Sequence, residues 1–402
     1  MAALTEEALA ADIRRELLGN ILPFWRLRTV DERHGGFIAE MSNDLQVSEA
    51  AAKGLILNAR ILWAFAAASR RLGQPEDRRL ARRACDYLEQ HLFDPEYGGY
   101  FWELEPDHRV RDDKKKIYGQ AFCLYALSEY HLAFGEPQAL HRAIDGFTRI
   151  EAGSHDPRNG GYLEVVNRDW TPCPDMRLSH KDMNAAKSMN NHLHLLEGYT
   201  NLYRVWPDAT LALRLRELID LFANRILNAD QTHFQHFFDI YWRPLSDTYT
   251  FGHDIEGSWL LCEAAKVLGD ERLLADVRAT AVRLARAVLS EGLDHDGGLL
   301  YEGRDGQIID ANKEWWPQSE AVVGFYNAWQ LTGEPPFREA AARCWQFIQD
   351  KIVDHRYGEW FWRVSRTGVP DLSMPKVSIW KCPYHNGRCC LEMLERLETH
   401  PA

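Results

Sequence analysis

Two kinds of helical pattern alternate along the chain. Residues 49–73 form a helical segment that is apolar nearly all round, as expected for a helix buried on every side. Residues 76–93 place apolar side chains on one face only and charges on the other, as expected for an outer helix. This alternation of inner and outer helices continues along the chain, so the pattern predicts a series of helix hairpins.

An aspartate and a glycine pair recur between the helical segments, each followed by a short aromatic stretch that predicts a strand. Related glycines are spaced by 63, 62, 137 and 61 residues, and the long interval is about two periods. A degenerate copy is therefore expected near residues 234–247, which makes six repeated supersecondary units. The glycines are Gly35, Gly98, Gly160, Gly297 and Gly358.

Six hairpins with buried inner helices predict an all-α fold, an (α/α)6 barrel of six helix hairpins with short β-strands in the connecting loops. The alternative is an open superhelix of helix pairs. An open stack needs polar capping repeats, and none is evident here, so closure is favoured. No linker rich in Pro, Gly or Ser interrupts the chain, and we expect a single catalytic domain over residues 1–402.

The composition of the chain limits the classes of partner that it can bind. The net charge of -12 argues against nucleic acid and anionic membranes, which need concentrated Lys and Arg. The one basic run, residues 114–116, follows two aspartates and is expected to be a solvated loop. No secretory signal pattern or stretch of 18 apolar residues is present, and the eight cysteines form no CxxC pair. A reduced cytoplasmic protein, monomer or homodimer, fits these features.

Polar residues inside otherwise apolar helices are the candidates for chemistry. Arg60 lies in "LILNARILWAF", where a buried guanidinium needs either a substrate or an ion pair with a neighbouring helix. Further along, Asn190, His194 and Glu197 share one helical face, whereas His192 points elsewhere. His194 is therefore the histidine with polar partners, although a hydrogen-bonded core histidine remains the alternative.

The segment "GHDIEGSW" places His253, Glu256 and Trp259 on one face of a predicted helix. Glu256 is expected to hydrogen-bond His253 and raise its basicity. Asp254 points away and is expected to cap the helix. Acids in a first turn can also serve only the helix dipole, which would explain Asp254 but not His253.

Two later segments extend this set. In "KEWWPQSEAVVGF", Glu320 is expected in the first turn of a helix, where capping is the alternative role, and Trp315 and Trp316 in the preceding loop. In "IWKCPYHNGRCC", His385 is expected in a loop running into the last helix, five residues after Trp380. Polar loop residues on a rigid scaffold are often functional. The alternatives are that His385 is an ordinary surface residue and that the tryptophans belong to the core.

The common enzyme motifs are missing. The sequence contains no HExxH, Cys/His finger, GxSxG, GxGxxG or Walker loop, so it signals no metal, no nucleophile and no nucleotide cofactor. Several histidines remain, with glutamates, an arginine, an asparagine, a tyrosine and tryptophans. Imidazole titrates near neutral pH and can both remove and return a proton, so this set suits acid–base work on a neutral polyhydroxylated substrate.

Five stretches together resemble the N-acylglucosamine 2-epimerase superfamily, most closely its cellobiose 2-epimerases. They are spread over most of the chain in the family's order. One departure is Asn191, where the family pattern has Thr, and it lies off the face of Asn190 and His194. The stretches are "IYGQAFCLYALSEY", "KSMNNHLHLLEGYTNLYRVW", "TFGHDIEGSWLL", "KEWWPQSEAVVGF" and "WKCPYHNGRCCLEM".

The resemblance implies an (α/α)6 barrel and metal-independent, cofactor-free epimerisation at C2 of the reducing-end glucose of β-1,4-linked disaccharides. It implies His253 and His385 as the acid/base pair, tuned by Glu256 and Glu320. It also implies that further side chains hold the O1/O2 region or stack on sugar rings. These are Arg60, Tyr118, Asn190, His194, Trp316 and Trp380, and Trp259 on the His253 face is a further candidate.

Other functions remain open on the same scaffold. An aldose–ketose isomerase would return the proton to C1, and an N-acylglucosamine or mannobiose 2-epimerase would prefer another sugar. A glycoside hydrolase would need two carboxylates across the scissile bond, for which Glu256 and Glu320 could serve. A non-catalytic sugar-binding protein would explain the tryptophans but leave the His and Glu residues without a purpose.

Overall fold

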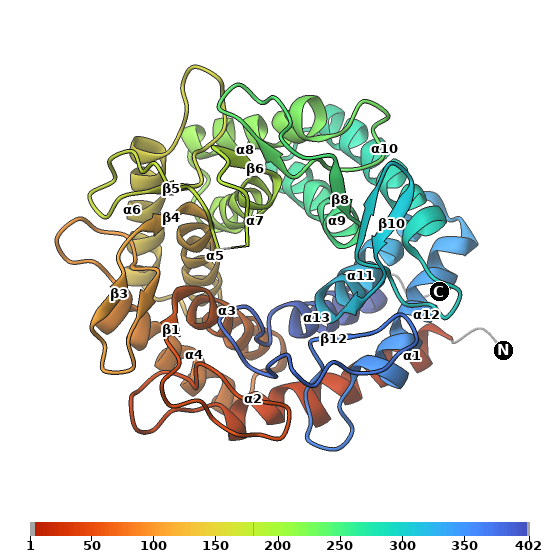
Figure 1. Cartoon of the computed structure of the whole chain (residues 1–402), viewed down its shortest axis with the longest axis horizontal. Helices are drawn as coiled ribbons and strands as arrows, with labels where there is room; N and C mark the ends of the chain where they lie inside the picture. Colours follow the sequence, from red (N-terminus) through yellow and green to blue (C-terminus); the bar gives the residue numbers. More distant parts are fainter. Residues whose placement is uncertain (1–4, 180, 400–402) are drawn as a thin grey trace.

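The computed structural model describes residues 5–179 and 181–399. Its inner helices stand side by side in a closed ring, and the outer helices surround them (Figure 1). The inner helices are α3 (Leu55–Leu72), α5 (Ile117–Phe134), α7 (Met189–Val205), α9 (Phe251–Leu268), α11 (Trp315–Thr332) and α13 (His385–Thr399). The outer helices are α1 (Glu6–Glu16) continuing into α2 (Leu22–Arg28), α4 (Pro75–Tyr87), α6 (Pro137–Gly153), α8 (Ala209–Leu221), α10 (Glu271–Ala287) and α12 (Pro335–Phe347).

This arrangement confirms the predicted (α/α)6 barrel. The inner helices are buried from their first residue, as in α3, where every residue from Leu55 to Ala68 is buried. Gly73 ends α3 in the left-handed conformation that glycine adopts without steric cost. The expected domain ends, residues 1 and 402, lie outside the described residues. No helix within the described ranges combines the length and apolar character needed to cross a bilayer.

One-turn π-helical segments extend five of the outer helices. One of them joins α1 to α2, and the other four end their outer helices. These segments are η1 (Leu17–Ile21), η2 (Leu88–Leu92), η3 (Phe222–Ile226), η4 (Val288–Gly292) and η5 (Ile348–Ile352).

Small antiparallel sheets connect neighbouring units at the end of the ring where the inner helices begin. Each pairs a strand just before an inner helix with a strand from the following loop. Met41 pairs with Val377, so the first unit meets the last and the ring is closed. The strands are β1 (Lys53–Gly54), β2 (Glu103–Leu104), β3 (Val110–Asp112), β4 (Lys115–Lys116), β5 (Val165–Val166), β6 (Lys187–Ser188), β7 (Phe237–Phe238), β8 (Thr248–Thr250), β9 (Glu302–Arg304), β10 (Gln307–Asp310), β11 (Lys313–Glu314) and β12 (Arg363–Val364).

An equivalent β-bridge closes the turn in all six units, and five of the six turns contain the repeated Asp and Gly residues. The bridge between Leu227 and Phe234 is the degenerate copy expected near residues 234–247. In the other five units the turn aspartate forms an ion pair with a buried lysine that precedes the next inner helix, such as Lys115 with Asp94 at 2.9 Å. The expected solvated loop at residues 114–116 is therefore wrong, because Lys115 is buried as half of such a pair.

Candidate active site

The candidate active site is a cavity of ≈ 230 Å³ at the end of the ring where the inner helices begin. Nine of the predicted site residues line it: Arg60, Tyr118, Asn190, His194, His253, Glu256, Trp316, Trp380 and His385. Glu320 and Trp259 do not line the cavity and are buried behind His385. Trp315, which the sequence analysis named with Trp316, also lines it. Residues that were not predicted as part of the site complete the lining: Leu178, Ser179, Asp182, Tyr301, Glu314 and Trp362.

His385 is the first residue of α13 and is 5% exposed, so the expected position in a loop is wrong, as is the surface alternative. Its Nδ1 lies 2.7 Å from Oε1 of Glu320. An ionised carboxylate only accepts hydrogen bonds, so Nδ1 carries the proton and Nε2 keeps a free lone pair. Burial lowers the pKa of His385 to about 3, although the Glu320 carboxylate opposes the shift. The ring is therefore a neutral base at neutral pH.

His253 lies in the first turn of α9, and its hydrogen-bond partner differs from the expectation. Its Nδ1 lies 2.5 Å from Oγ1 of Thr250, whereas Glu256 is bonded to Arg388 at 2.6 Å. The sequence predicted that Glu256 would hydrogen-bond His253, and this prediction is wrong. Burial, together with neighbouring histidines, holds the pKa of His253 well below its usual value, so this ring is also neutral.

Asp254 and Trp259 also differ from expectation. Asp254 does not cap α9: it is fully buried and accepts hydrogen bonds from His233 Nδ1 and the Phe234 backbone N–H, both at 2.8 Å. Trp259 donates from Nε1 to Glu320 at 3.1 Å, is 1% exposed and does not line the cavity. Both side chains share the predicted helix, but neighbouring segments decide which groups they contact.

Trp316 lies between the two histidines. Its ring centroid is 4.7 Å from that of His253 and 5.7 Å from that of His385. A Cβ on Gly252 would lie 2.6 Å from the indole, so only glycine lets Trp316 pack against α9 here. Trp315 and Trp316 are the first two residues of α11, and the expectation that they lie in a loop is therefore wrong.

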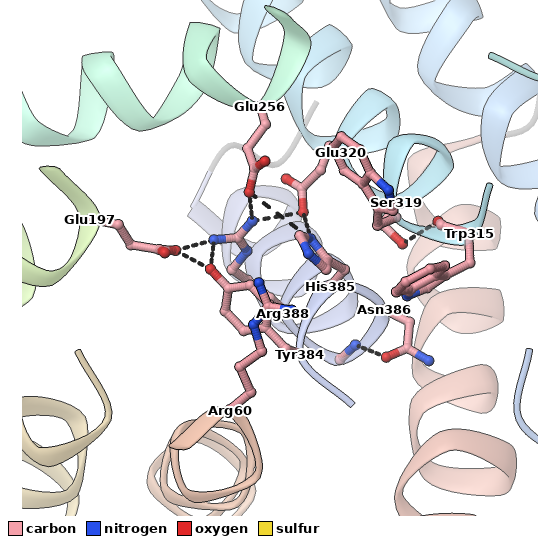
Figure 2. Close-up of polar contacts among 12 residues, drawn as sticks. Arg60, Glu197, Glu256, Trp315, Ser319, Glu320, Tyr384, His385, Asn386 and Arg388 are labelled. Carbon is pink, nitrogen blue, oxygen red and sulfur yellow. Dashed lines mark hydrogen bonds and ion pairs between the residues drawn. The ribbon is translucent and has the colours of Figure 1, made fainter. Parts of the chain in front are cut away.

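A buried arginine that the sequence analysis missed binds three glutamates, of which Glu256 lines the cavity (Figure 2). Nη2 of Arg388 donates to Glu256 at 2.6 Å and to Glu320 at 2.7 Å, and Nη1 donates to Glu197 and to the Tyr384 hydroxyl. Arg388 lies near the start of α13, where every residue from His385 to Leu391 is buried. The argument applied to Arg60, that a buried guanidinium needs acceptors, would have found it. Glu320 is thus a partner of Arg388 and His385 and not a helix cap.

Arg60 has a different environment. Its guanidinium donates to the Tyr118 hydroxyl at 2.7 Å and to the Trp380 backbone carbonyl at 3.2 Å, and it lies over the Phe122 ring. No carboxylate pairs with it among the described residues, so the ion-pair alternative for Arg60 is wrong. Its buried Nε has no hydrogen-bond partner there, nor has Oδ1 of Asn190. Both residues line the cavity, which leaves a donor and an acceptor for a polar ligand.

The two histidines of α7 are separated as predicted. Nδ1 of His194 lies 3.0 Å from Glu197 Oε2, and the ring lines the cavity. His192 is a structural histidine, because its Nδ1 lies 2.6 Å from the Ser188 carbonyl and its Nε2 accepts from the Tyr162 backbone N–H. The face shared by Asn190 and His194 is therefore the one that meets the site.

Residues 36–387 match the family model of N-acylglucosamine 2-epimerase (GlcNAc 2-epimerase). The chain belongs to this family. It is 45% identical to the cellobiose 2-epimerase of Bacteroides fragilis, over 97% of this chain and 99% of that protein. It is 36% identical to the cellobiose 2-epimerase of Dictyoglomus turgidum, over the same shares of the two chains. The cellobiose 2-epimerase structure from Bacillus thermoamylovorans is 38% identical, with a TM-score of 0.92 over 97% and 100% of the chains.

These findings confirm the family expected from the sequence and make the chain a carbohydrate epimerase. In this epimerase three carboxyl groups contact one guanidinium, so the negative charges would outnumber the positive one if all three were ionised. The three residues are Glu197, Glu256 and Glu320. Burial and the Glu320 carboxylate raise the pKa of Glu256 to about 8, against the opposing effect of Arg388. Burial also acts on Glu197 and Glu320, but there Arg388 and a histidine outweigh it and lower the pKa. With Glu256 protonated, the carboxylates of Glu197 and Glu320 remain in ion pairs with the Arg388 cation.

The shifted carboxyl predicts a pH dependence of stability. Between the ordinary Glu pKa of 4.5 and about 8, the folded epimerase binds a proton at Glu256 that the unfolded chain releases. The free energy of unfolding therefore falls as the pH rises through this window. Glu256→Gln removes the titration, so we expect the variant to gain more than ~1 kcal/mol over the parent between pH 5 and pH 8.

Urea unfolding of both proteins at pH 5, 6.5 and 8 checks this expectation. Glu339→Gln, at an exposed position on α12, serves as the matched control and should follow the parent at every pH. A constant difference between Glu256→Gln and the parent across the three pH values would contradict the assignment of the proton to Glu256.

Proposed function

We propose that this epimerase inverts C2 of the reducing-end glucose of β-1,4-linked disaccharides, converting cellobiose to glucosyl-mannose and lactose to epilactose. The observation that carries the proposal is a pair of neutral, buried histidines on one cavity, with an indole between them. Inversion requires removing a proton on one face of C2 and adding one on the other, for which two separate bases are suited. The substrate class comes from the cellobiose 2-epimerases to which the chain is similar.

The C2 proton is acidic only beside a carbonyl, so the sugar first opens to the aldehyde. One histidine then removes the C2 proton and leaves an enediolate. The Arg60 guanidinium and the Tyr118 hydroxyl, joined at 2.7 Å, face the cavity where this negative charge develops. Rotation about the C2–C3 bond presents the other face, and the second histidine protonates it.

Both histidines are neutral in the free protein, so one of them must take up a proton before C2 is deprotonated. The pair then holds one imidazolium at the start of the reaction and one at the end. The two rings are not equivalent in this respect. His385 has the Glu320 carboxylate at 2.7 Å, which favours its charged form, whereas His253 has only the Thr250 hydroxyl. We therefore assign His385 as the initial acid and His253 as the initial base, with the roles exchanged in the reverse reaction.

The proposed reaction needs no metal or other cofactor. Glu256, Glu320 and His385 have ligand atoms within 4.8 Å of one another, a spacing that a metal ion could use. Nη2 of Arg388 already lies within hydrogen-bond distance of both carboxylates, so a cation stands beside this set. The same contact argues against a glycoside hydrolase, because the two carboxylates point at one nitrogen and not across a scissile bond.

Incubation with cellobiose or lactose in D2O with a chelator, followed by NMR, tests the proposal. Deuterium at C2 together with a mannose-configured reducing end is the expected result. A ketose product would instead indicate the aldose–ketose isomerase, and turnover confined to N-acylglucosamine or mannobiose would indicate those 2-epimerases. Release of free glucose would indicate a hydrolase, and binding without exchange at C2 a sugar-binding protein.

The outer part of the cavity predicts a preference for disaccharides. Trp362 and Trp316 both donate to Glu314, at 3.3 and 3.1 Å, so one carboxyl orients both indoles. Asp182 and Ser179, from the loop before β6, also line the cavity. We propose that the second sugar ring lies on this surface, since none of these groups is part of the acid/base pair.

Trp362→Ala is accordingly expected to raise KM for cellobiose about tenfold while changing KM for a monosaccharide little, because one stacking surface is lost. Initial rates with cellobiose and with glucose measure the ratio. Tyr241→Ala, at an exposed aromatic residue outside the cavity, is the matched control. Equal effects on both sugars would show that Trp362 supports the pocket without contacting a second ring.

Eight free thiols, seven of them buried, support the proposal that this single-domain enzyme works in the reducing cytoplasm.

A further inference from the structure

Thr250 is placed to cap α9, but its side chain is used differently. It is the N-cap residue of the helix, and it makes no side-chain capping bond. Ser188, in the same position at α7, accepts from the Asn191 backbone N–H at 3.1 Å in the ordinary way. The Thr250 hydroxyl instead lies 2.5 Å from His253 Nδ1. The Thr250 hydroxyl thus contacts the proposed catalytic His253 and does not cap the helix.

A third histidine lies behind this contact. His236 stands just before β7, and its Nε2 accepts from the Thr250 backbone N–H at 3.2 Å. The same Nε2 lies 3.4 Å from the Thr250 hydroxyl oxygen. The ring meets His253 edge to face, with 5.6 Å between centroids. Nothing in the proposed reaction uses His236.

The backbone contact settles which hydrogen-bonding role His236 plays. Because an N–H donates to Nε2, that nitrogen is unprotonated and can only accept. Burial lowers the pKa of His236 to about 4, so the ring stays neutral at neutral pH. The single lone pair of Nε2 already accepts the backbone N–H, and the Thr250 hydroxyl hydrogen can share it in a three-centre bond, with 3.4 Å between Oγ1 and Nε2. When the hydroxyl hydrogen points there, the lone pairs of Oγ1 face His253 Nδ1.

We propose that Thr250 and His236 are positioning residues that hold His253 in the tautomer with its proton on Nδ1, leaving Nε2 free for the C2 proton. Nδ1–H donates to Oγ1 of Thr250, and the Thr250 hydroxyl donates to Nε2 of His236. The bonds do not change when His253 becomes an imidazolium, since Nδ1–H is present in both states. No proton leaves the relay, which only orients the ring.

This inference rests on the proposed function, in which His253 is a base. It explains an asymmetry of the site, because His385 is oriented by a carboxylate and His253 by a neutral hydroxyl. A hydroxyl fixes the tautomer without stabilising the imidazolium as a carboxylate would. The His253 imidazolium is therefore less stable than it would be beside a carboxylate, and it releases its proton readily.

The test compares Thr250→Val, which keeps the shape without the hydroxyl, with Thr250→Ser, which keeps the hydroxyl. Removing a group that orients a metal-ligating histidine commonly costs about 10- to 100-fold in activity, and we take the same factor for the orientation of His253. We expect Thr250→Val to lower kcat by about that factor with KM within about twofold, and Thr250→Ser to recover most of it. His236→Leu should lower kcat likewise, while His236→Gln, whose amide oxygen can accept, should retain more.

Deuterium exchange in D2O separates this role from general damage. If only His253 is impaired, the epimer whose C2 proton faces His385 still exchanges that proton faster than it forms product. His253→Asn gives the reference for this behaviour, and a variant that still epimerises normally would refute the two-histidine proposal itself. If His253→Asn is inactive but Thr250→Val matches the parent, the relay alone is refuted. Thr250→Ser as impaired as Thr250→Val, or equal loss of exchange from both epimers, would also refute it.

Discussion

Replacing His385 by Asn is expected to lower kcat for epimerisation by about 10²- to 10⁴-fold, the usual contribution of a general acid–base group. Asn keeps a hydrogen-bond donor for Glu320 but cannot carry the proton that C2 receives. His253 is left intact, so the epimer whose C2 proton faces it should still exchange with D2O. Initial rates of product formation and of deuterium uptake, measured on the same sample by NMR, check both statements.

His141→Asn is the control for this experiment, because His141 is exposed on an outer helix away from the cavity. It should leave both rates unchanged. The proposal predicts a split between exchange and inversion that a single base acting on both faces would not give. A variant at His385 that loses exchange and inversion of both epimers in parallel, or one that retains the parental kcat, would contradict the two-base assignment.

The fold was predictable because its determinants are local. Apolar inner helices and amphipathic outer ones can be recognised from side-chain spacing, and the turn aspartates recur at the required intervals. Their partners were less evident, since Lys115 and Asp94 meet only when a strand places them together. The fourth unit along the chain lacks the glycines, but Leu227 and Phe234 keep the bridge, which shows that the turn survives without them.

The sequence could predict most of the residues that form the site, but it could not predict which of them contact each other. His253 and Glu256 share a helical face, and sequence spacing favours a contact between them. Arg388 binds Glu256 instead, because it comes from α13 across the ring and offers a charge that His253 lacks. Contacts between different helices of a closed ring are set by the whole fold, so spacing within one helix cannot assign them. Trp362 was missed for the same reason, since only the closed ring places its loop at the cavity.

The second large effect concerns stability. Arg388→Met is expected to lower the free energy of unfolding by about 3–5 kcal/mol, the usual loss when one member of a buried ion network is removed. The arginine side chain is 1% exposed and binds glutamates from α7, α9 and α11, so its removal leaves buried carboxylates without a counter-charge. Urea unfolding, with the thermal midpoint as a second measure, tests the loss. Arg286→Met, in an exposed pair with Glu334, should cost less than about 1 kcal/mol.

The loss should also depend on pH in a defined direction. Arg388 holds the pKa of Glu197 and Glu320 below the ordinary value, so without it burial raises both. The folded variant then binds protons that the unfolded chain releases above about pH 4.5, and its stability falls as the pH rises. Arg388→Met should therefore be closest to the parent near pH 5 and furthest from it near pH 8. Arg388→Lys keeps the charge but not the forked geometry, so its free energy of unfolding should lie between those of the parent and Arg388→Met. A loss that does not depend on pH would instead indicate that Arg388 stabilises the fold by packing against Trp259 and Tyr384.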